Sequence, residues 1–362
     1  MKRPLLRWAP RLLGLGLVGV VLSLVGWGDR VRDVDGREWT GSLVRHGPGF
    51  VVLERDGEEA GIEIDPARGG AVRVGLRTTF GRLTGSPGAL LLGVTLHLAC
   101  LLLGALRWRV LLRGAGLETT TAQVLRLSWL GLFMANILPG IAGGDLVRAV
   151  YAGHSHPEGR ARAALSVVAD RLIGLLMLLC LAAGVLFVVP ARLLTPAQRW
   201  TLLGAAAGLG ALLAAAIAFG AGRPVEGADS SGRPRLRGLL AERAAALAHY
   251  ARCPGVCLVA GLLSLAGHLG LLAALWSYGR ALGVDLSLLA IGVGVPAAQA
   301  VSAVPLLPGG WGLGESAYYV ILGRAGVAGG TAVALSVSYR VIQTLLSLPG
   351  GLFLRAGRAK TS

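Results

Sequence analysis

A small set of ionisable side chains interrupts the long apolar stretches of this 362-residue chain. Because an ionised group at the centre of a bilayer costs roughly 2.5–3.5 kcal/mol, such side chains usually face a partner or a water-filled cavity. Guanidinium groups also bind phosphate through two parallel hydrogen bonds, so arginines in these positions suit an anion-binding site. The candidate substrate-binding residues selected on this ground are Asp145, Arg148, Asp170, Arg171, Glu315 and Arg340.

The spacing of these residues allows particular pairings. Asp145 and Arg148 are one helical turn apart, so they can share a helix face and direct the guanidinium toward a phosphate. Arg340 can pair with Glu315 or with Asp170. A purely structural salt bridge is the alternative role for Arg340, and extension toward the membrane surface is the alternative for Arg171.

Two interruptions rich in glycine and proline, residues 136–148 and 304–315, break apolar runs at corresponding points. Each contains Leu-Pro-Gly, further glycines, one carboxylate and the start of a new helix. Paired broken helices indicate a transporter binding site, since the N-termini of half-helices direct N–H groups at an anion. Ordinary helix caps and kinks are the alternative interpretation. The backbone residues of the two predicted breaks are Pro139, Gly140, Gly143, Gly144, Pro308, Gly309 and Gly310.

The elements that position these residues are predicted to be membrane helices. Hydrophobic residues make up 54% of the chain and charged residues 15%, and several apolar runs reach the ~20 residues that cross a bilayer. Spans are expected within residues 12–27, 88–106, 125–139, 163–189, 200–220, 255–278, 286–307 and 328–354. The predicted fold is an all-α polytopic membrane protein with six full spans and two opposed re-entrant hairpins, plus a small all-β extracytoplasmic insert.

The net charge of +16 is unevenly distributed along the chain. Residues 28–87 contain nine arginines and ten acids, a net charge of −1, so the positive excess lies in the short loops between apolar runs. This distribution follows the positive-inside rule and predicts a cell (inner) membrane protein with both termini in the cytoplasm. The same distribution argues against nucleic acid as a partner.

Residues 28–87 form a polar insert with turn signals at Asp35-Gly36 and Asp56-Gly57. Alternating β-branched and polar residues flank both turns, which predicts a small barrel or sheet of four or five strands. The insert shows no catalytic pattern. Docking of an envelope partner is its expected role, and sensing of lipid head groups is the alternative.

The remaining residue types show no catalytic or metal-binding pattern. The four cysteines match no zinc or redox spacing, and His97 and His268 lie singly on apolar stretches. No nucleophile lies near a base in the sequence. We therefore expect no catalytic residue, no metal, no cofactor and no enzymatic activity.

Three motifs in order resemble the lysylphosphatidylglycerol synthase transmembrane, or flippase-like, family: NILPGIAGGDLVR from residue 136, ADRLIGL from 169 and PLLPGGWGLGE from 305. The resemblance covers residues 90–354 and implies a lipid-flipping membrane domain. It adds Asn136 to the substrate-binding candidates. The chain shows no aminoacyl transferase domain after the membrane part, so lipid synthesis from aminoacyl-tRNA is not expected.

These observations predict four segments: a first span at 1–27, the β insert at 28–87, a flippase-like domain at 88–354 and a cytoplasmic tail at 355–362. The predicted function is movement of an anionic phospholipid or polyprenyl-linked lipid between leaflets, with membrane lipids as partners. One alternative is a membrane-embedded enzyme or accessory protein of lipid modification. The other is a scaffold that transports nothing.

Overall fold

The computed structural model describes residues 28–33, 35, 37–47, 50–55, 58–63, 71–73, 77–78, 81, 85–137, 142–187, 250, 253–284, 286, 288–302, 313–324, 326–327 and 329–353, with scattered positions between 195 and 211. The predicted first span at 1–27, the tail at 355–362 and most of the predicted span at 200–220 lie outside these residues. So do five of the predicted break residues, Pro139, Gly140, Pro308, Gly309 and Gly310.

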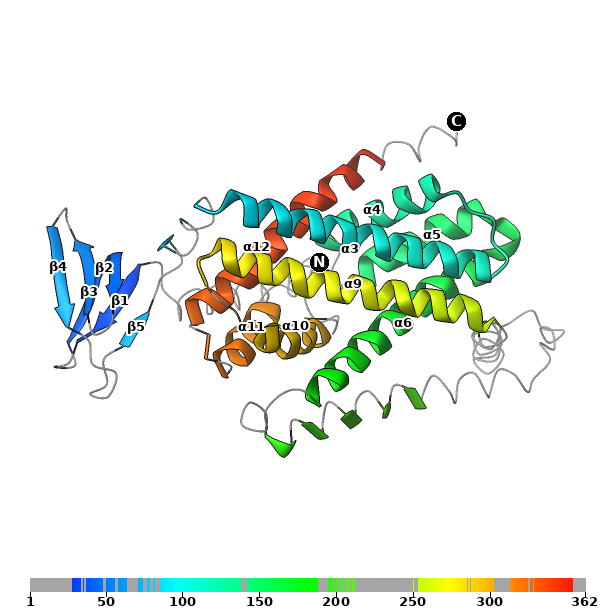
Figure 1. Ribbon diagram of the computed structural model, residues 1–362. Helices are drawn as coiled ribbons and strands as arrows, with labels where there is room; N and C mark the ends of the chain where they lie inside the picture. The colour runs from blue at the N-terminus through cyan, green and yellow to red at the C-terminus, as the bar shows by residue number, and fades with distance from the viewer. Residues whose placement is uncertain are drawn as a thin grey trace, which may run out of the picture. The chain divides into compact units, whose positions relative to one another are not determined.

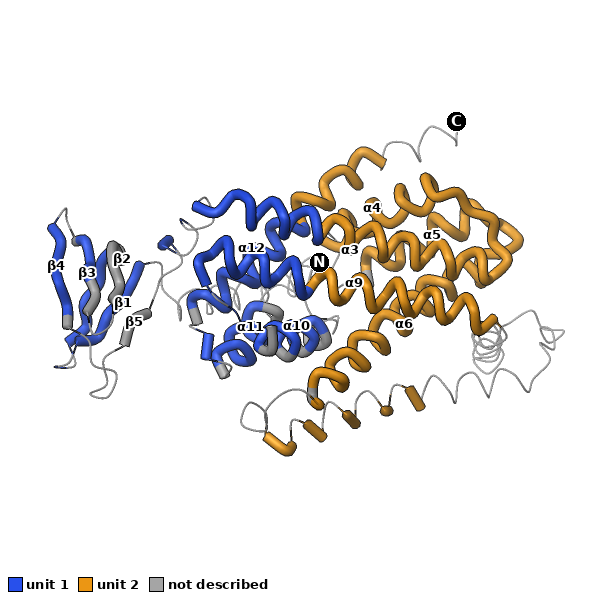
Figure 2. Tube along the Cα trace, in the orientation of Figure 1, with its two compact units in different colours: residues 1–96, 272–343 blue, residues 97–271, 344–362 orange. Residues whose placement is uncertain are grey.

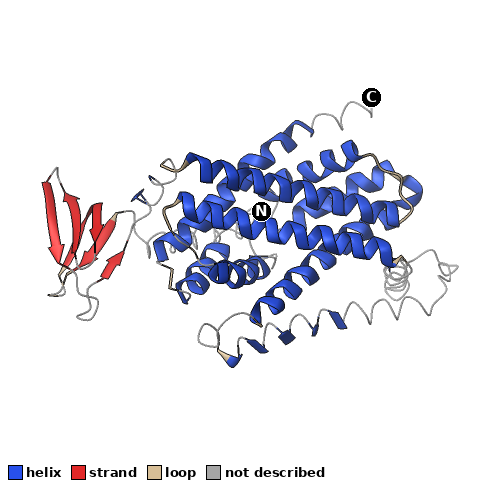
Figure 3. Cartoon of the chain, viewed as in Figure 1, coloured by secondary structure: helices blue, strands red, loops and turns tan. Residues whose placement is uncertain are grey.

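The chain divides into two compact units (Figure 2). Unit 1 consists of Met1–Leu96 and Leu272–Gln343, and unit 2 consists of His97–Leu271 and Thr344–Ser362. Helices make up nearly all of the described chain after residue 86, whereas the strands all lie before it (Figure 3). This separation agrees with the predicted order of a β insert followed by a helical membrane part.

Four segments of the described chain are long and apolar enough to cross a membrane: Pro87–Gly114, Pro157–Val185, Pro254–Ala281 and Gly330–Leu352. They comprise α3 (Pro87–Gly114), η2 (Pro157–Gly159) with α6 (Arg160–Leu186), α9 (Pro254–Ala281), and α12 (Gly329–Ser347) with η5 (Leu348–Leu352) (Figure 1). A 28-residue helix is about 42 Å long, which exceeds the ~30 Å hydrocarbon core. By length and composition, the described chain thus has the helices that a multi-pass membrane protein requires.

The sequence-based end of the first of these spans was wrong. A span of 88–106 followed by a basic loop starting at Arg107 was expected, but α3 continues as a helix to Gly114. Trp108, Leu111 and Leu112 are fully buried on this extension, so packing keeps the chain helical beyond the first arginine. Arg107 therefore lies inside a helix of unit 2.

Shorter helices flank each predicted break. The helices α4 (Thr121–Ile137) and α5 (Ala142–Ser155) pack against each other, and so do α10 (Leu288–Ser302) and α11 (Leu313–Arg324). At 1.5 Å per residue these four helices are roughly 18–25 Å long, shorter than the hydrocarbon core. Each break thus joins two short helices that form a hairpin. Whether the hairpins are re-entrant, and from which side they enter, stays a prediction.

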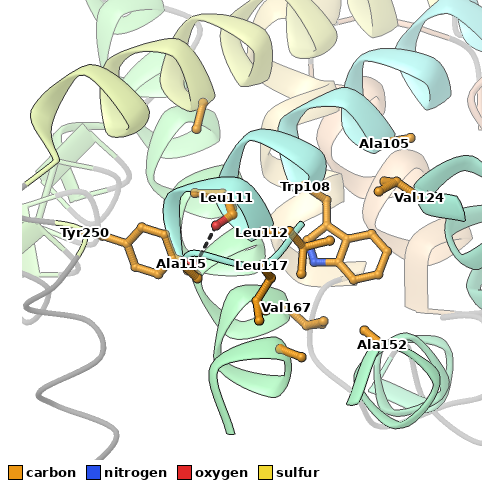
Figure 4. Packing of buried hydrophobic residues seen from close by; sticks show 13 residues of the cluster. Ala105, Trp108, Leu111, Leu112, Ala115, Leu117, Val124, Ala152, Val167 and Tyr250 are labelled. Atoms are coloured by element: carbon orange, nitrogen blue, oxygen red, sulfur yellow. Dashed lines mark hydrogen bonds between the residues drawn. The ribbon is translucent and has the colours of Figure 1, made fainter. Parts of the chain in front are cut away.

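Unit 2 is packed around a core that begins on α3 (Figure 4). The Trp108 indole nitrogen donates to Ser166 Oγ at 3.1 Å, and the Tyr250 hydroxyl donates to the Leu111 carbonyl at 3.0 Å. Large aromatic side chains avoid the desolvation penalty of an unpaired polar atom when that atom forms a hydrogen bond. The core therefore fixes one face of α3 against α6 and leaves Arg107 on the adjoining surface of the helix.

The insert forms a five-stranded antiparallel sheet in the order β4-β3-β2-β1-β5. Its strands are β1 (Asp29–Arg32), β2 (Glu38–Gly47), β3 (Phe50–Arg55), β4 (Glu58–Glu63) and β5 (Ala71–Arg73). The strands on either side of each predicted Asp-Gly turn pair as expected, β1 with β2 and β3 with β4, while Gly36, Asp56 and Gly57 themselves lie outside the described residues. Val31, Leu53 and Ile62 are buried. The strand number agrees with the prediction, while the extracytoplasmic location stays a prediction.

Asp33 organises the turn between β1 and β2. Its carboxylate accepts hydrogen bonds from the backbone N–H groups of Asp35 (3.0 Å) and Arg37 (2.8 Å) and from the Trp39 indole (2.8 Å). The indole hydrogen bond, assisted by the backbone ones, lowers the pKa of Asp33 below its ordinary value of 3.8. A carboxylate that accepts three donors favours its charged form.

This lowered pKa makes the turn sensitive to acid. Because the folded state holds the charged form, the contribution of Asp33 to stability is fully present above pH 3.8 and is lost as the pH falls through the lowered pKa. We expect Asp33→Ala to make the insert cleavable by protease at neutral pH, and the unmodified chain to become cleavable there only in strong acid. Limited proteolysis with an acid-tolerant protease measures both. Asp35→Ala removes an equal charge from the same turn, so equal cleavage of the two variants would contradict the prediction.

Candidate functional site

Four of the predicted binding residues come together in unit 2. Asp145 and Arg148 lie on α5, and Asp170 and Arg171 lie on α6, which packs against α5. A cavity of about 150 Å³ lies among them, bounded also by α3 and α4. The structure thus brings together four of the seven predicted binding residues, and their role in binding stays a prediction.

Asp170 is the buried centre of the site, with only 2% of its surface exposed. The Arg107 Nε lies 2.7 Å from one carboxylate oxygen, and both terminal nitrogens of Arg148 lie 3.2 Å from the other. Arg107 also donates to Ser264 Oγ at 2.8 Å. A carboxylate removed from water is stable only with such partners, so the two arginines and Asp170 stabilise one another.

Asp145 forms a second, more open ion pair. Arg171 donates to both of its carboxylate oxygens, from Nε at 2.5 Å and from a terminal nitrogen at 3.0 Å. The predicted helical-turn pairing with Arg148 is also present, at 3.4 Å. The Arg171 side chain is 54% exposed, in contrast to 11% for Arg148. The outer edge of the site therefore consists of Arg171 and Asp145.

The position of Arg148 depends on an aromatic ring, Trp108, and on the absence of a side chain at Gly131. Its guanidinium carbon lies 4.1 Å from the centre of the Trp108 ring, a favourable cation–π arrangement. Its aliphatic stem crosses Gly131 of α4, where a Cβ would lie 2.7 Å from the Arg148 Cγ. Small residues let membrane helices approach closely, and this glycine gives the arginine its path into the site.

The two hairpin helices approach each other at a second glycine. A Cβ on Gly144 would lie 2.3 Å from the Gly131 carbonyl oxygen. Because that oxygen belongs to the backbone, the clash could be relieved only by moving a helix. Gly144 is buried and lies in the first turn of α5, next to Gly143. The predicted role of Gly144 as a backbone residue of the break thus has a physical basis in the packing of α4 against α5.

The cavity itself carries a net positive charge. Three arginines and two aspartates line it, which gives +3 − 2 = +1, and Ser128 adds a hydroxyl. Ser128 is 7% exposed, and its Oγ has no hydrogen-bond partner among the described residues. The buried Nε of Arg148 likewise lacks an acceptor in the described part of the chain. Both residues line the arginine-lined space, which has a suitable size for one small anionic group.

The remaining predicted binding residues lie elsewhere. Asn136 is not among the lining residues of this cavity, and its side-chain amide donates to Ser347 Oγ at 2.9 Å, which joins α4 to the end of α12. In unit 1, Arg340 of α12 pairs with Glu315 of α11 at 2.5 Å. Glu315 is 1% exposed and also accepts from Ser336. Of the two partners predicted for Arg340, Glu315 is the one found.

Sequence reasoning missed four residues of the unit 2 site: Arg107, Trp108, Ser128 and Ser264. Arg107 was assigned to a basic loop. The signal that it belongs to a helix was present, because the run LLLGALRWRVLL continues apolar residues at helical spacing on both sides of it. The serines gave no signal, because isolated hydroxyl residues are frequent in membrane helices.

Comparison with known proteins places the chain in context. Residues 73–351 match the family model described as "Lysylphosphatidylglycerol synthase TM region". Over 86 residues the chain is 27% identical to a protein of Pyrococcus horikoshii described as a UPF0104 membrane protein. That similarity covers 23% of this chain and about a quarter, 26%, of the relative. No solved structure matches the chain.

Proposed function

Because the chain belongs to the lysylphosphatidylglycerol synthase TM-region family, we propose that it moves an anionic lipid between the two leaflets of a cell membrane. The lipid carries its head-group charge on a phosphate, either in a phospholipid or in a polyprenyl-linked lipid. The lipid tails stay in the bilayer throughout. In this proposal the protein is a multi-pass transporter of the inner membrane. Its termini are cytoplasmic, and it performs no covalent chemistry.

The observation that carries this proposal is the arginine-lined cavity of unit 2. Moving a bare phosphate through hydrocarbon is prohibitive, because an ion taken from water into a medium of low dielectric constant loses of order 20 kcal/mol of solvation. Arg148, Arg171 and the Ser128 hydroxyl offer donors that replace part of that hydration. The net charge of +1 gives the site the sign that a phosphate requires.

The hairpin formed by α4 and α5 supports the same conclusion. The first turn of α5 contains Gly144 and Asp145 and borders the cavity, so the positive end of that helix adds to its potential. Helices shorter than the bilayer suit a re-entrant hairpin that ends at a cavity, since irregular backbone at membrane depth must be buried in protein or line a wet space. The hairpin of α10 and α11 is the corresponding element of unit 1. The β insert lies outside the membrane in this proposal and is available to an envelope partner.

A transport assay tests the proposal. The purified chain is placed in liposomes that contain fluorescent phosphatidylglycerol, and dithionite then bleaches only the outer leaflet. We expect the wild-type chain to expose the inner-leaflet label and Arg148→Ala to slow that exposure by tenfold or more, on the order of the 1.4 kcal/mol that one charged hydrogen bond contributes. Arg113→Ala, an exposed arginine in the last turn of α3, is the matched control and is expected to leave transport unchanged.

Three outcomes would count against lipid transport. A wild-type chain that exposes no label would overturn it, as would an Arg148→Ala form that is folded and transports at the wild-type rate. A covalently altered lipid recovered from the liposomes would favour the membrane-embedded enzyme instead. Mass spectrometry of the extracted lipids distinguishes a moved lipid from a modified one.

A further inference from the structure

The three arginines of the cavity differ in how firmly they are held. Arg107 is bound to Asp170 and Ser264, and Arg148 is bound to Asp170 and stacked on Trp108. Their side chains are 15% and 11% exposed. Withdrawal of either one from Asp170 would weaken a buried ion pair, which costs several kcal/mol in an apolar interior. These two arginines form the fixed wall of the cavity.

Arg171 is held by a contact that is easier to exchange. Within the described part of the chain its hydrogen bonds go to Asp145, and its side chain is 54% exposed. The Arg171 side chain is about half exposed and its partner Asp145 is 17% exposed, whereas the members of the Asp170 pairs are only 3–15% exposed. An incoming anion that offers Arg171 the same two hydrogen bonds therefore meets less resistance there than it would at Asp170.

The Asp145 carboxylate has the geometry that such an anion must imitate. It presents two oxygens and one negative charge to the Arg171 guanidinium, as a phosphodiester does. Asp145 also has another guanidinium available, because Arg148 lies 3.4 Å from one of its oxygens. Displacement of Asp145 from Arg171 therefore leaves the carboxylate beside a cation.

From these contacts we propose that Arg171 is the arginine that takes the substrate anion, and that Asp145 is an internal carboxylate exchanged for it. In the anion-free state the Asp145 carboxylate accepts the hydrogen bonds of Arg171. The anion enters the cavity, takes the Arg171 hydrogen bonds and meets the Ser128 hydroxyl and the Arg148 Nε, which have no hydrogen-bond partner among the described residues, while Asp145 shifts to Arg148. When Asp145 returns, it expels the anion. The ligand class is a singly charged phosphodiester. This inference rests on the proposed function and assigns its binding and release step.

A binding experiment on the full chain in dodecyl maltoside tests the exchange. Isothermal titration uses two phosphodiesters, dioctanoyl phosphatidylglycerol and dimethyl phosphate, so that a lipid ligand is distinguished from a soluble one. Removal of the competing charge by Asp145→Asn is expected to tighten binding of the phosphatidylglycerol about tenfold, and Arg171→Gln to weaken it about tenfold. Glu118→Gln neutralises an exposed acid away from the cavity and is expected to bind as the wild type does.

The double variant Asp145→Asn/Arg171→Gln is expected to bind as weakly as Arg171→Gln, since the gain from the first change requires the arginine. Tight binding by the double variant would overturn the assignment of Arg171. Wild-type affinity in Asp145→Asn would overturn the exchange, and so would a wild type and an Asp145→Asn form that both bind neither compound. Dimethyl phosphate alone responding to the two variants would restrict the ligand to a soluble phosphodiester and contradict the lipid assignment.

The same variants separate this inference from the proposed function. In the liposome assay Asp145→Asn is expected to bind the lipid more tightly and to release it more slowly, so that transport falls while affinity rises. A wild type that moves lipid, with Asp145→Asn unchanged in affinity, refutes the exchange and leaves the transporter intact. A wild type that binds as described and moves no lipid refutes the transporter and leaves the exchange.

Discussion

Replacement of Asp170 with alanine is expected to lower the free energy of unfolding by about 3–5 kcal/mol, the usual cost of removing one partner from a buried ion pair. The carboxylate is 2% exposed and accepts hydrogen bonds from both Arg107 and Arg148. Without it, Arg107 loses its carboxylate partner, and Arg148 keeps only the longer 3.4 Å pairing with Asp145. Both desolvation and mutual repulsion then oppose the folded state.

Unfolding by sodium dodecyl sulphate in dodecyl maltoside micelles, followed by tryptophan fluorescence, measures this loss. Asp145→Ala removes an equal charge from the same cavity, but from a carboxylate whose side chain is 17% exposed instead of 3%, so it is the matched control and is expected to cost less than Asp170→Ala. Equal unfolding curves for the two variants would show that Asp170 contributes no more to the free energy of unfolding than Asp145 does. That result would contradict the ranking of the two ion pairs.

A triple variant separates the structural role of Asp170 from its place in the site. Replacing a buried ion network by apolar residues of similar volume is often neutral or stabilising, because no desolvated charge remains. We expect Asp170→Leu combined with Arg107→Met and Arg148→Met to recover most of the stability that Asp170→Ala loses. The same protein is expected to move no anionic lipid, since the fixed cationic wall of the cavity is gone. Transport by this variant would exclude the cavity as the route.

Local patterns in the sequence predicted the parts of this structure that depend on near neighbours. The Asp-Gly signals predicted that β1 pairs with β2 and β3 with β4, since two residues with the right backbone freedom suffice to reverse the chain, and both pairings are present. The pairing of Asp145 with Arg148 follows from helical spacing in the same way. Both are decided within a few residues, so no knowledge of the tertiary fold is needed.

The pairings that define the cavity depend on contacts distant in the sequence. Arg107 meets Asp170 across 63 positions and Ser264 across 157, distances at which the sequence gives no register. Arg148 was expected to direct its guanidinium at a substrate phosphate, whereas the structure turns it onto Trp108 and Asp170. Which arginine is the most exposed therefore becomes visible only when their neighbours are known, and it is Arg171.

The glycine contact between α4 and α5 is expected to be the second most sensitive point of the site. A Cβ at position 144 would lie 2.3 Å from the Gly131 carbonyl oxygen, and ordinary contact begins at 3.4 Å, so α5 would have to move by 3.4 − 2.3 = 1.1 Å. Gly144→Ala is therefore expected to cost about 3 kcal/mol, the upper end of the range for overpacking, because a backbone atom cannot turn aside as a side chain can. The shift also displaces Asp145 and Arg148 on the same helix, so transport should fall with stability.

Gly153→Ala is the matched control for this change. It makes the same substitution on the same helix, but the three atoms nearest to its Cβ would all belong to Arg160, at 3.6–3.7 Å. Since alanine is favoured over glycine in a helix by roughly 0.5–1 kcal/mol, this variant is expected to be as stable as the wild type or slightly more so. The detergent unfolding curve and the liposome assay report both variants together. Equal stability of Gly144→Ala and Gly153→Ala would mean that α4 and α5 do not depend on this close approach, and the position of Arg148 in the cavity would then need another cause.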